Sequence, residues 1–401
     1  TKPFLMPRFS FFISHSKEPV TADSWIWHEP IPLRLDALIK DDGDEDSVSH
    51  AAYFRATRTF LEANSFEVIT RAVSRQLDRD VKAPDIEEIR VCLEKHGEFY
   101  HPSRIETVVY QQQLSFVLNV ALSETGRRFL EAVFHLLNRL NTAQPLHYLP
   151  QAYGFGRAVE AGGQKFAMYL GQWFDGYHEF HISIDPIDKT PKIMVWDDVR
   201  DRFFLSVEQT KTLYAQVAKI LTGYYHLASF EQIFSWHHAA GDFIVKVEDG
   251  KLDLRLVTVR RYGAIFERQK NTRTPPVDLQ QILQALLIFF LGLSIHMRLD
   301  RLDGIGEMVW SDSVSVEATL IGFLEALSMK PDIPSLPDSP LACFVAYLAS
   351  CTEGDMIDLT AEIVNRFNPQ MPELSVIKKN IHQHAETLHA SIQQILSIST
   401  T

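Results

Sequence analysis

The chain has 401 residues, of which 46% are hydrophobic and 22% charged, and this composition is typical of a folded globular protein rather than a disordered one. Its formal net charge of −12 argues against a large basic surface, so we expect neither nucleic acid nor a membrane as a partner. The three cysteines (Cys92, Cys343 and Cys351) form no Cys-x-x-Cys pair, which indicates a reduced setting.

Two apolar stretches do not have the features of membrane or export signals. Residues 4–13 run directly into Lys17 and Glu18, without the small-residue cleavage site of an export signal. Residues 282–295 are shorter than a membrane span and include Gln284, which favours a buried core helix. We therefore expect a cytoplasmic protein.

The first hundred residues predict an N-terminal helical extension after an irregular start. Apolar residues recur at helical spacing over 53–61, 66–77 and 86–93. The acidic cluster at 41–46 lacks the ligand order and the closing glutamate of a calcium loop. It therefore predicts a solvated turn that places negative charge at the start of the next helix.

From about residue 105 the apolar spacing becomes that of strands. Residues 105–109 and 116–122 predict two strands joined by a polar turn, and a helix with Leu137 and Leu140 on its inner face follows. Two further strands are predicted at 153–159 and 165–173.

The second half of the sequence predicts mostly helices. Ser206 and Gln209 form a capping box at the start of one helix. A hairpin over 243–259 turns at Asp249-Gly250, which is a strong turn signal. Helical spacing then predicts five more helices, at 277–298, 314–328, 339–351, 355–367 and 373–397.

The segment from Trp236 to Val245, followed by a hairpin that ends at Arg260, has the form of a kinase catalytic loop and metal-binding strand. With the order of the predicted elements over 100–330, it resembles the protein-kinase-like superfamily, in particular a bacterial type within the aminoglycoside and small-molecule phosphotransferase branch. The resemblance implies an α+β, protein-kinase-like two-lobed fold. Its parts would be a helical extension (1–100), a small lobe of antiparallel sheet plus one helix (101–175), and a mainly helical large lobe ending in a C-terminal helix (176–401).

The resemblance also shows which phosphate-binding groups differ. In that family a lysine on the third strand binds the nucleotide phosphates and pairs with a glutamate on the next helix. Here Asn119 occupies the lysine position and Glu131 the glutamate position, and an amide cannot offset phosphate charge. The turn at 110–115, predicted to join the first two strands, has no glycine, so we expect the family's glycine-rich loop to be missing.

The catalytic loop allows two alignments. Hairpin spacing places Asp242 at the metal-binding asparagine and Thr258 at the metal-binding aspartate. It also places Ala239, after His237, at the catalytic aspartate. The alternative treats Gly241-Asp242-Phe243 as the family's Gly-Asp-Phe and makes Asp242 the base.

Polar residues near the expected inter-lobe hinge allow further interpretations. His178, Glu179 and His181 follow the fifth strand, and His237 with His238 lie on the catalytic loop. They could form a transition-metal site, hydrogen-bond backbone carbonyls and so hold the lobes, or line a pocket without metal. Arg260 offers a guanidinium for an anionic group.

We therefore expect a catalytically impaired, pseudokinase-like protein that acts by binding a ligand or partner. Conventional Mg-ATP is disfavoured as its cofactor, no metal site is assigned, and the terminal helices offer surfaces for a protein partner or homodimer. One alternative is a phosphotransferase with a rearranged site using Asp242; a weaker one is a metal-dependent hydrolase using the histidines. The candidate catalytic residues are Asp242 and His237. The candidate ligand-binding residues are Asn119, Glu131, Glu179, His181, His238, Thr258 and Arg260.

Overall fold

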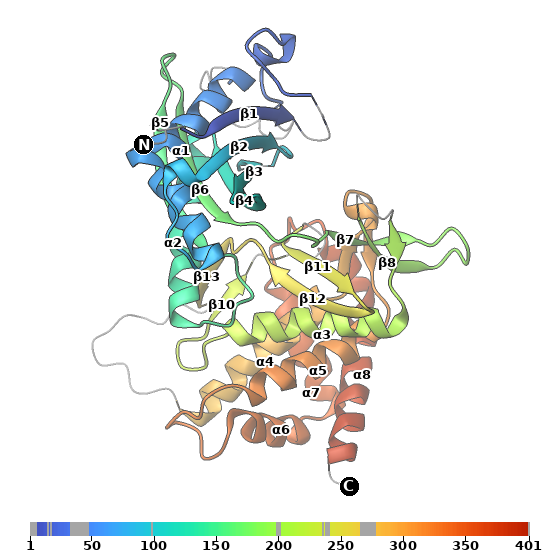
Figure 1. The fold of residues 1–401 in the computed structure, drawn as a ribbon. Coiled ribbons are helices and arrows are strands. Elements are labelled where there is room, and N and C mark those ends of the chain that lie inside the picture. Colours follow the sequence, from blue (N-terminus) through green and yellow to red (C-terminus); the bar gives the residue numbers. More distant parts are fainter. Residues whose placement is uncertain are drawn as a thin grey trace. The chain divides into compact units, whose positions relative to one another are not determined.

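The structure is a computed structural model. It describes residues 6–13, 16, 18–32, 48–97, 99–197, 202–234, 236, 241–264 and 278–399. Over these ranges it contains eight α-helices and a mixed six-stranded sheet with four smaller sheets, which is compatible with the predicted α+β class (Figure 1). The chain divides into two compact units. Unit 1 comprises Thr1–Pro145 and Pro150–Asp175, and unit 2 comprises Leu146–Leu149 and Gly176–Thr401.

Unit 1 is built on the six-stranded sheet, whose order is β1-β2-β3-β4-β6-β5. Its strands are β1 (Arg8–Ile13), β2 (Ile86–Leu93), β3 (His101–Val109), β4 (Gln112–Ala121), β5 (Ala152–Val159) and β6 (Lys165–Gln172). β1 pairs with β2 in parallel and all other neighbours are antiparallel. The strands β2, β3 and β4 therefore form a meander. The next strand in the sheet is β6, although α2 (Glu124–Ala143) and β5 lie between β4 and β6 in the chain.

One face of this sheet forms the apolar core of unit 1 together with α1 (His50–Leu77). Ser49 caps α1 by accepting a hydrogen bond from the Ala52 backbone N–H, and the helix is interrupted by a non-helical segment at 63–66. Because side chains alternate along a strand, Ile89, Val91 and Leu93 all point into this core. Figure 1 shows α1 beside the β5–β6 end of the sheet.

The opposite face carries polar side chains over β2–β4 and is covered by α2 at its β5–β6 end. There the Phe134 ring of α2 lies 6.0 Å from the Tyr169 ring of β6, measured between centroids. The strand register brings together a set that we call the polar face: Glu88, Arg90, Cys92, Arg104, Glu106, Ser115 and Asn119. Unit 1 is thus apolar under α1 and polar on the other side of the sheet.

The helix predicted over 86–93 is wrong, because these residues form β2. A register shift between Ile86 and Glu88 interrupts the alternation of buried residues. The apolar residues Ile86 and Ile89 are consequently spaced as on a helix, while the remainder alternates as a strand should. The first hundred residues thus contribute two strands as well as α1 to the unit that also contains 101–145.

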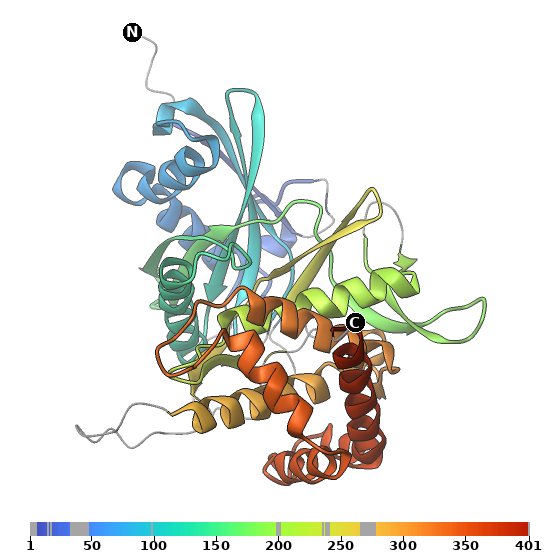
Figure 2. The same ribbon diagram turned by 90° about the horizontal axis from the view of Figure 1, so that it is seen from below.

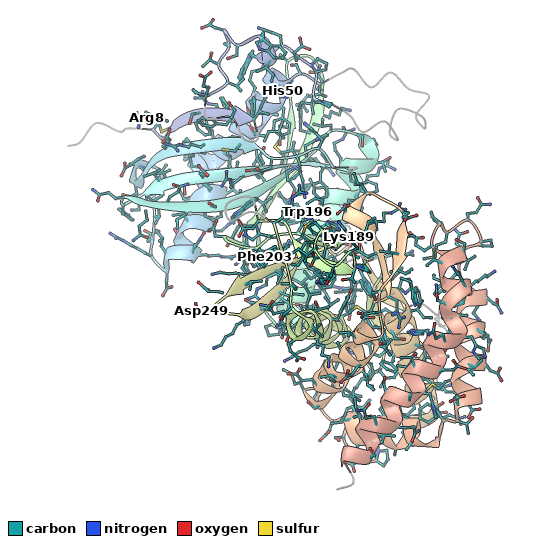
Figure 3. The ribbon with its side chains drawn as sticks, turned by 90° about the vertical axis from the view of Figure 1, so that its right-hand side faces the viewer. Arg8, His50, Lys189, Trp196, Phe203 and Asp249 are labelled. Carbon is teal, nitrogen blue, oxygen red and sulfur yellow. The ribbon has the colours of Figure 1, made fainter. Side chains whose placement is uncertain are left out.

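Unit 2 begins with short sheets around α3 (Val207–Tyr224). The sheets contain β7 (Phe180–Ile184), β8 (Pro191–Val195), β9 (Phe203–Phe204), β10 (Glu231–Phe234), β11 (Phe243–Glu248), β12 (Lys251–Leu256), β13 (Arg261–Ala264), β14 (Leu299–Arg301) and β15 (Met308–Trp310). The predicted β11–β12 hairpin is confirmed, and Figure 3 labels Asp249 at its tip. The capping box predicted at Ser206 and Gln209 is also present.

The five helices predicted after the hairpin are confirmed with small changes at their ends. They are α4 (Leu279–His296), α5 (Val314–Ser328), α6 (Pro340–Ser350), α7 (Glu353–Asn365) and α8 (Leu374–Ser399). They lie below α3 in Figure 1, and Figure 2 shows them from below in orange to red. On α8 the residues Ile377, Leu388 and Ile392 are buried, so its apolar stripe packs inside the unit.

Among the described helices, α4 is the one that is long and apolar enough to span a membrane, with a mean hydropathy of 1.6. Ten of its residues are buried against other parts of the protein, and 56% of the apolar window is buried overall. A core helix of a soluble protein has the same composition, so α4 alone is weak support for a membrane span.

Candidate functional site

The carboxylate of Asp242 forms a buried ion pair at the start of β11. Its side chain is 2% exposed, and Oδ1 lies 2.9 Å from Nη2 of Arg260. Its backbone carbonyl accepts a hydrogen bond from the Val257 N–H at 2.8 Å. Asp242 precedes β11 and Arg260 follows β12, so pairing of the two strands brings both residues to the same end of the hairpin.

Glu179 is the third charged residue at this place. Gly241 adopts a positive φ of 69°, and a Cβ added there would lie 2.8 Å from Oε1 of Glu179. The positive φ favours glycine at 241, and the carboxylate of Glu179 would have to move to make room for a larger residue. The structure thus brings together three candidate residues predicted from the sequence, Glu179, Asp242 and Arg260, within unit 2.

Thr258 lies after β12 and is half-buried. It follows Val257, whose N–H donates to the Asp242 carbonyl, and precedes the buried Val259. A threonine hydroxyl carries no charge, whereas Mg²⁺ sites in nucleotide-binding enzymes use carboxylates. Of the two residues aligned with metal ligands, Thr258 is therefore neutral and Asp242 is already paired with a guanidinium.

His178 and His181 occupy different environments. The backbone of His178 exchanges two 2.9 Å hydrogen bonds with Val245, and its Nε2 lies 3.6 Å from Oδ2 of Asp197. Sequence reasoning did not identify Asp197 because it lies 19 residues further along the chain (197 − 178), beyond β8.

His181 is packed in the interior of unit 2. The side chain of His181 is 4% exposed, with its Nδ1 3.8 Å from Oδ1 of the fully buried Asp300. Its ring lies against Gly304, where a Cβ would come within 2.8 Å, and 4.7 Å from the ring of Trp196, a residue labelled in Figure 3. Asp300 in turn accepts a hydrogen bond from the Ile182 N–H at 2.8 Å. These contacts suit a histidine that packs in the interior better than one that binds a metal ion or a small molecule.

Metal binding has no support in the part of the chain that the structure describes. No group of three or more His, Cys, Asp or Glu side chains is arranged there to hold a metal ion. The predicted candidates His237 and His238 lie outside the described residues, as does Ala239.

In unit 1 the predicted candidates Asn119 and Glu131 each have another partner. Asn119 is buried on β4, where its side chain hydrogen-bonds Tyr169 across the strand pair. Glu131 of α2 accepts a hydrogen bond from Nη2 of Arg157 at 2.6 Å. The pair of residues aligned with the family's lysine and glutamate is therefore replaced by two separate contacts.

The sequence predicts that the family's glycine-rich loop corresponds to the turn at 110–115, which is the wrong turn. Because β2 is a strand, the loop between the first two strands of the meander is 94–100, and the turn at 110–111 joins the second and third. This loop contains Gly97, whose N–H donates to the Tyr100 carbonyl at 3.1 Å. A Cβ at Gly97 would lie 2.6 Å from that oxygen, so this glycine serves the turn itself.

The guanidinium groups of the polar face are engaged by carboxylates. Arg90 lies 2.9 Å from Glu88, and Arg104 lies 2.8 Å from Glu94 and 3.2 Å from Glu106. The hydrogen bond from Arg90 holds the pKa of Glu88 below its usual value. An anionic ligand on this face would have to displace these carboxylates.

The thiol of Cys92 is a potential nucleophile that lies among the charged residues of the polar face. Burial raises the pKa of its thiol to about 12, and the charge of Glu106 adds to the effect. The thiol is therefore protonated at neutral pH and is not an activated nucleophile.

No family model and no curated protein matches the chain. Solved structures do match, among them "WaaP in complex with acyl carrier protein", with a TM-score of 0.32 and 11% sequence identity. That likeness covers 69% of this chain and 88% of the other. It is a weak likeness, which assigns neither a family nor an activity.

Proposed function

We propose that this chain is a kinase-like protein that has lost the groups for Mg-ATP chemistry and acts by binding a ligand or a protein partner. The order of elements supports the fold: β2, β3, β4, α2, β5 and β6 in unit 1, then α3 and the β11–β12 hairpin in unit 2. With β2 included, Asn119 lies on the third strand of the meander and Glu131 on the next helix. These are the positions that the resemblance predicts for the phosphate lysine and its glutamate.

The main support for a loss of Mg-ATP chemistry is the Asp242–Arg260 ion pair. Phosphoryl transfer depends on metal ions that bridge and neutralise the phosphates, and those ions are held by carboxylate or amide oxygens. A carboxylate that is almost fully buried and bonded to a guanidinium would have to lose a favourable ion pair before it could bind Mg²⁺. Thr258 supplies no compensating charge.

The phosphate-binding side of the fold supports the same conclusion. Asn119 replaces a cation and already hydrogen-bonds Tyr169, and the arginines of the polar face are paired with glutamates. Phosphate recognition usually relies on guanidinium, ammonium or unengaged backbone N–H groups. The polar face offers few such donors for a nucleotide triphosphate.

Phosphate release from ATP tests the proposal. We expect purified protein incubated with ATP and either Mg²⁺ or Mn²⁺ to release no more phosphate than buffer does, and we expect Asp242→Ala to behave identically. Metal-dependent release that disappears in Asp242→Ala would overturn the proposal.

That outcome would favour the second candidate, a phosphotransferase with a rearranged site. It has one observation in its support: the carboxylate of Glu179 approaches Gly241, the residue that precedes Asp242 in the chain. If this candidate is right, Glu179→Gln should also reduce transfer from labelled ATP, and so should Glu131→Gln if Glu131 serves as a second carboxylate.

A cytoplasmic location and a protein partner or homodimer remain proposals. The apolar stripe of α8 is used inside unit 2, so a partner that binds this helix would contact its exposed polar side.

A further inference from the structure

The helix α1 is interrupted near its middle by residues in left-handed backbone conformations. The interruption covers 63–66, a segment that we call the hinge, and it separates a first half of α1 from a second half. Asn64, Ser65 and Phe66 have φ values of 50°, 59° and 67°. A single asparagine tolerates this conformation, but three consecutive left-handed residues, one of them a buried phenylalanine, are unfavourable for L-amino acids. The hinge therefore holds backbone strain.

The sequence across the hinge does not require a break in the helix. From the first residue of α1 to the last there is neither glycine nor proline, and the leucine, glutamate and alanine that lead into the hinge favour helices. Leu61 and Val68 are seven residues apart, so they would lie on the same face of a continuous helix. Ala63, Asn64 and Ser65 are exposed, so a change in their backbone conformation would meet little packing.

The contacts of α1 with β5 show what a continuous helix would change. A Cβ added at Gly156 would lie 2.7 Å from the ring of Phe60 in the first half, and one added at Gly154 would lie 2.6 Å from Val68 in the second half. These glycines are two residues apart on one strand, a separation of about 7 Å. In an unbroken helix Phe60 and Val68 would be about 12 Å apart along the axis and turned by about 80° from each other. A straightened α1 would therefore keep only one of its halves on this sheet.

The part of the chain before the hinge carries much of the apolar core of unit 1, so it is unfavourable for that part to leave the sheet alone. The ring of Phe54 in the first half lies 4.9 Å from the ring of Phe11 on β1 and 5.9 Å from that of Trp27, measured between centroids. Phe54 and Leu61 are fully buried, and β1 pairs with β2. An opened monomer would expose these side chains to water. A second opened copy of the chain offers the same set of contacts again.

We propose that two copies of this chain exchange the segment that precedes the hinge and form a dimer in which α1 is one continuous helix. β1 and the first half of α1 belong to the exchanged segment. The dimer repeats the contacts of the closed monomer with two differences: each hinge loses its left-handed residues, and two chains lose their independent motion. A strained hinge favours such an exchange. This dimer gives a structural form to the homodimer proposed above, and it rests on contacts within unit 1, so the phosphate-release assay does not bear on it.

Two substitutions at the same exposed position test the role of the hinge. Ser65→Gly removes the steric cost of the left-handed conformation and disfavours a helix, so it should shift the equilibrium toward the monomer. Ser65→Ala keeps that cost and favours a helix, so it should shift the equilibrium toward the dimer. The dissociation constants of the two variants should differ by about tenfold for each hinge, and by about a hundredfold for a dimer with two hinges. Sedimentation equilibrium measures both; equal constants, or a monomeric Ser65→Ala at about 300 µM, would overturn the proposal.

Cross-linking between chains separates exchange from an ordinary surface dimer. Nε of Arg55, in the first half of α1, lies 3.0 Å from Oε2 of Glu160, between β5 and β6, and the two residues would come from different chains in the exchanged dimer. The Arg55 side chain is 54% exposed, so loss of this pair should leave the fold intact.

In the Ser65→Ala background, an Arg55→Cys chain and a Glu160→Cys chain are refolded together from urea and treated with a short thiol-specific cross-linker. The mixture should give a cross-linked pair of chains. Either variant alone, which retains the native cysteines, should give none. A dimer that forms in the mixture without this cross-link would contradict the exchange.

Discussion

The two partners of the Asp242–Arg260 ion pair are unequally buried, so removing each should have a different effect. Asp242 is 2% exposed and Arg260 is 29% exposed, measured on their side chains. Arg260→Ala leaves a buried carboxylate without its guanidinium and should lower the free energy of unfolding by about 2–3 kcal/mol. Asp242→Asn removes the buried charge and should cost less, because the remaining arginine can reach solvent.

Urea unfolding of both variants measures this difference. If Arg260→Ala were as stable as the wild type, the ion pair would contribute little, and Asp242 would be easier to recruit to a metal than we propose. A restored stability in the double variant Arg260→Ala, Asp242→Asn would identify the unpaired charge as the cause.

The sequence predicted part of this site. The hairpin signal at Asp249-Gly250 implies that residues flanking the two strands lie together, and Asp242 with Arg260 flank them. Glu179 was predicted as a candidate, but its approach to Gly241 depends on tertiary packing between segments about sixty residues apart, which periodicity does not encode. The partners of Asn119 and Glu131 were not predictable for the same reason, because Tyr169 and Arg157 lie on later strands.

At the scale of elements, the helices were the most predictable part of the chain. The helices α4–α8 have long apolar stripes and were predicted within a few residues. The strand β2 was not, because its register shift imitates helical spacing, and β1 was missed because its pairing partner is more than seventy residues away. Because β2 was predicted as a helix, the position of the glycine-rich loop was assigned to the turn after β3 and not to the loop between β2 and β3.

The contact between α3 and α5 gives a test of helix packing. Gly322 of α5 lies directly against the backbone of Ala215 in α3, and a Cβ there would lie 2.7 Å from the Ala215 carbonyl carbon and 2.9 Å from its Cα. Because these are backbone atoms, the helices must separate to accommodate a methyl group. Gly322→Ala should therefore lower the free energy of unfolding by about 3 kcal/mol.

Gly292 on α4 is the matched control for that substitution. A Cβ there meets no atom within 4 Å, so Gly292→Ala should be neutral or stabilise the protein by up to about 1 kcal/mol through helix propensity. Thermal unfolding followed by circular dichroism measures both variants. Similar midpoints for the two would contradict the close approach of α3 and α5.

At the scale of the whole molecule, the chain has two compact units, and each of them can have its own unfolding transition. Unit 1 has its own sheet and core, and unit 2 has its own helices, so unfolding need not be a single transition. A ligand that binds one unit should stabilise the transition of that unit in particular, which makes thermal unfolding informative even when the ligand's position is unknown.

The most direct measurement is a thermal unfolding titration with ATP, in the presence and absence of Mg²⁺. A ligand at a hundredfold excess over its dissociation constant stabilises its protein by about 2.7 kcal/mol, which raises the unfolding midpoint by several degrees. Because Asp242 is paired with Arg260, Thr258 is neutral and Asn119 replaces the phosphate cation, we predict no metal-dependent rise in the midpoint of either unit. A dose-dependent rise that requires both ATP and Mg²⁺ would contradict the account.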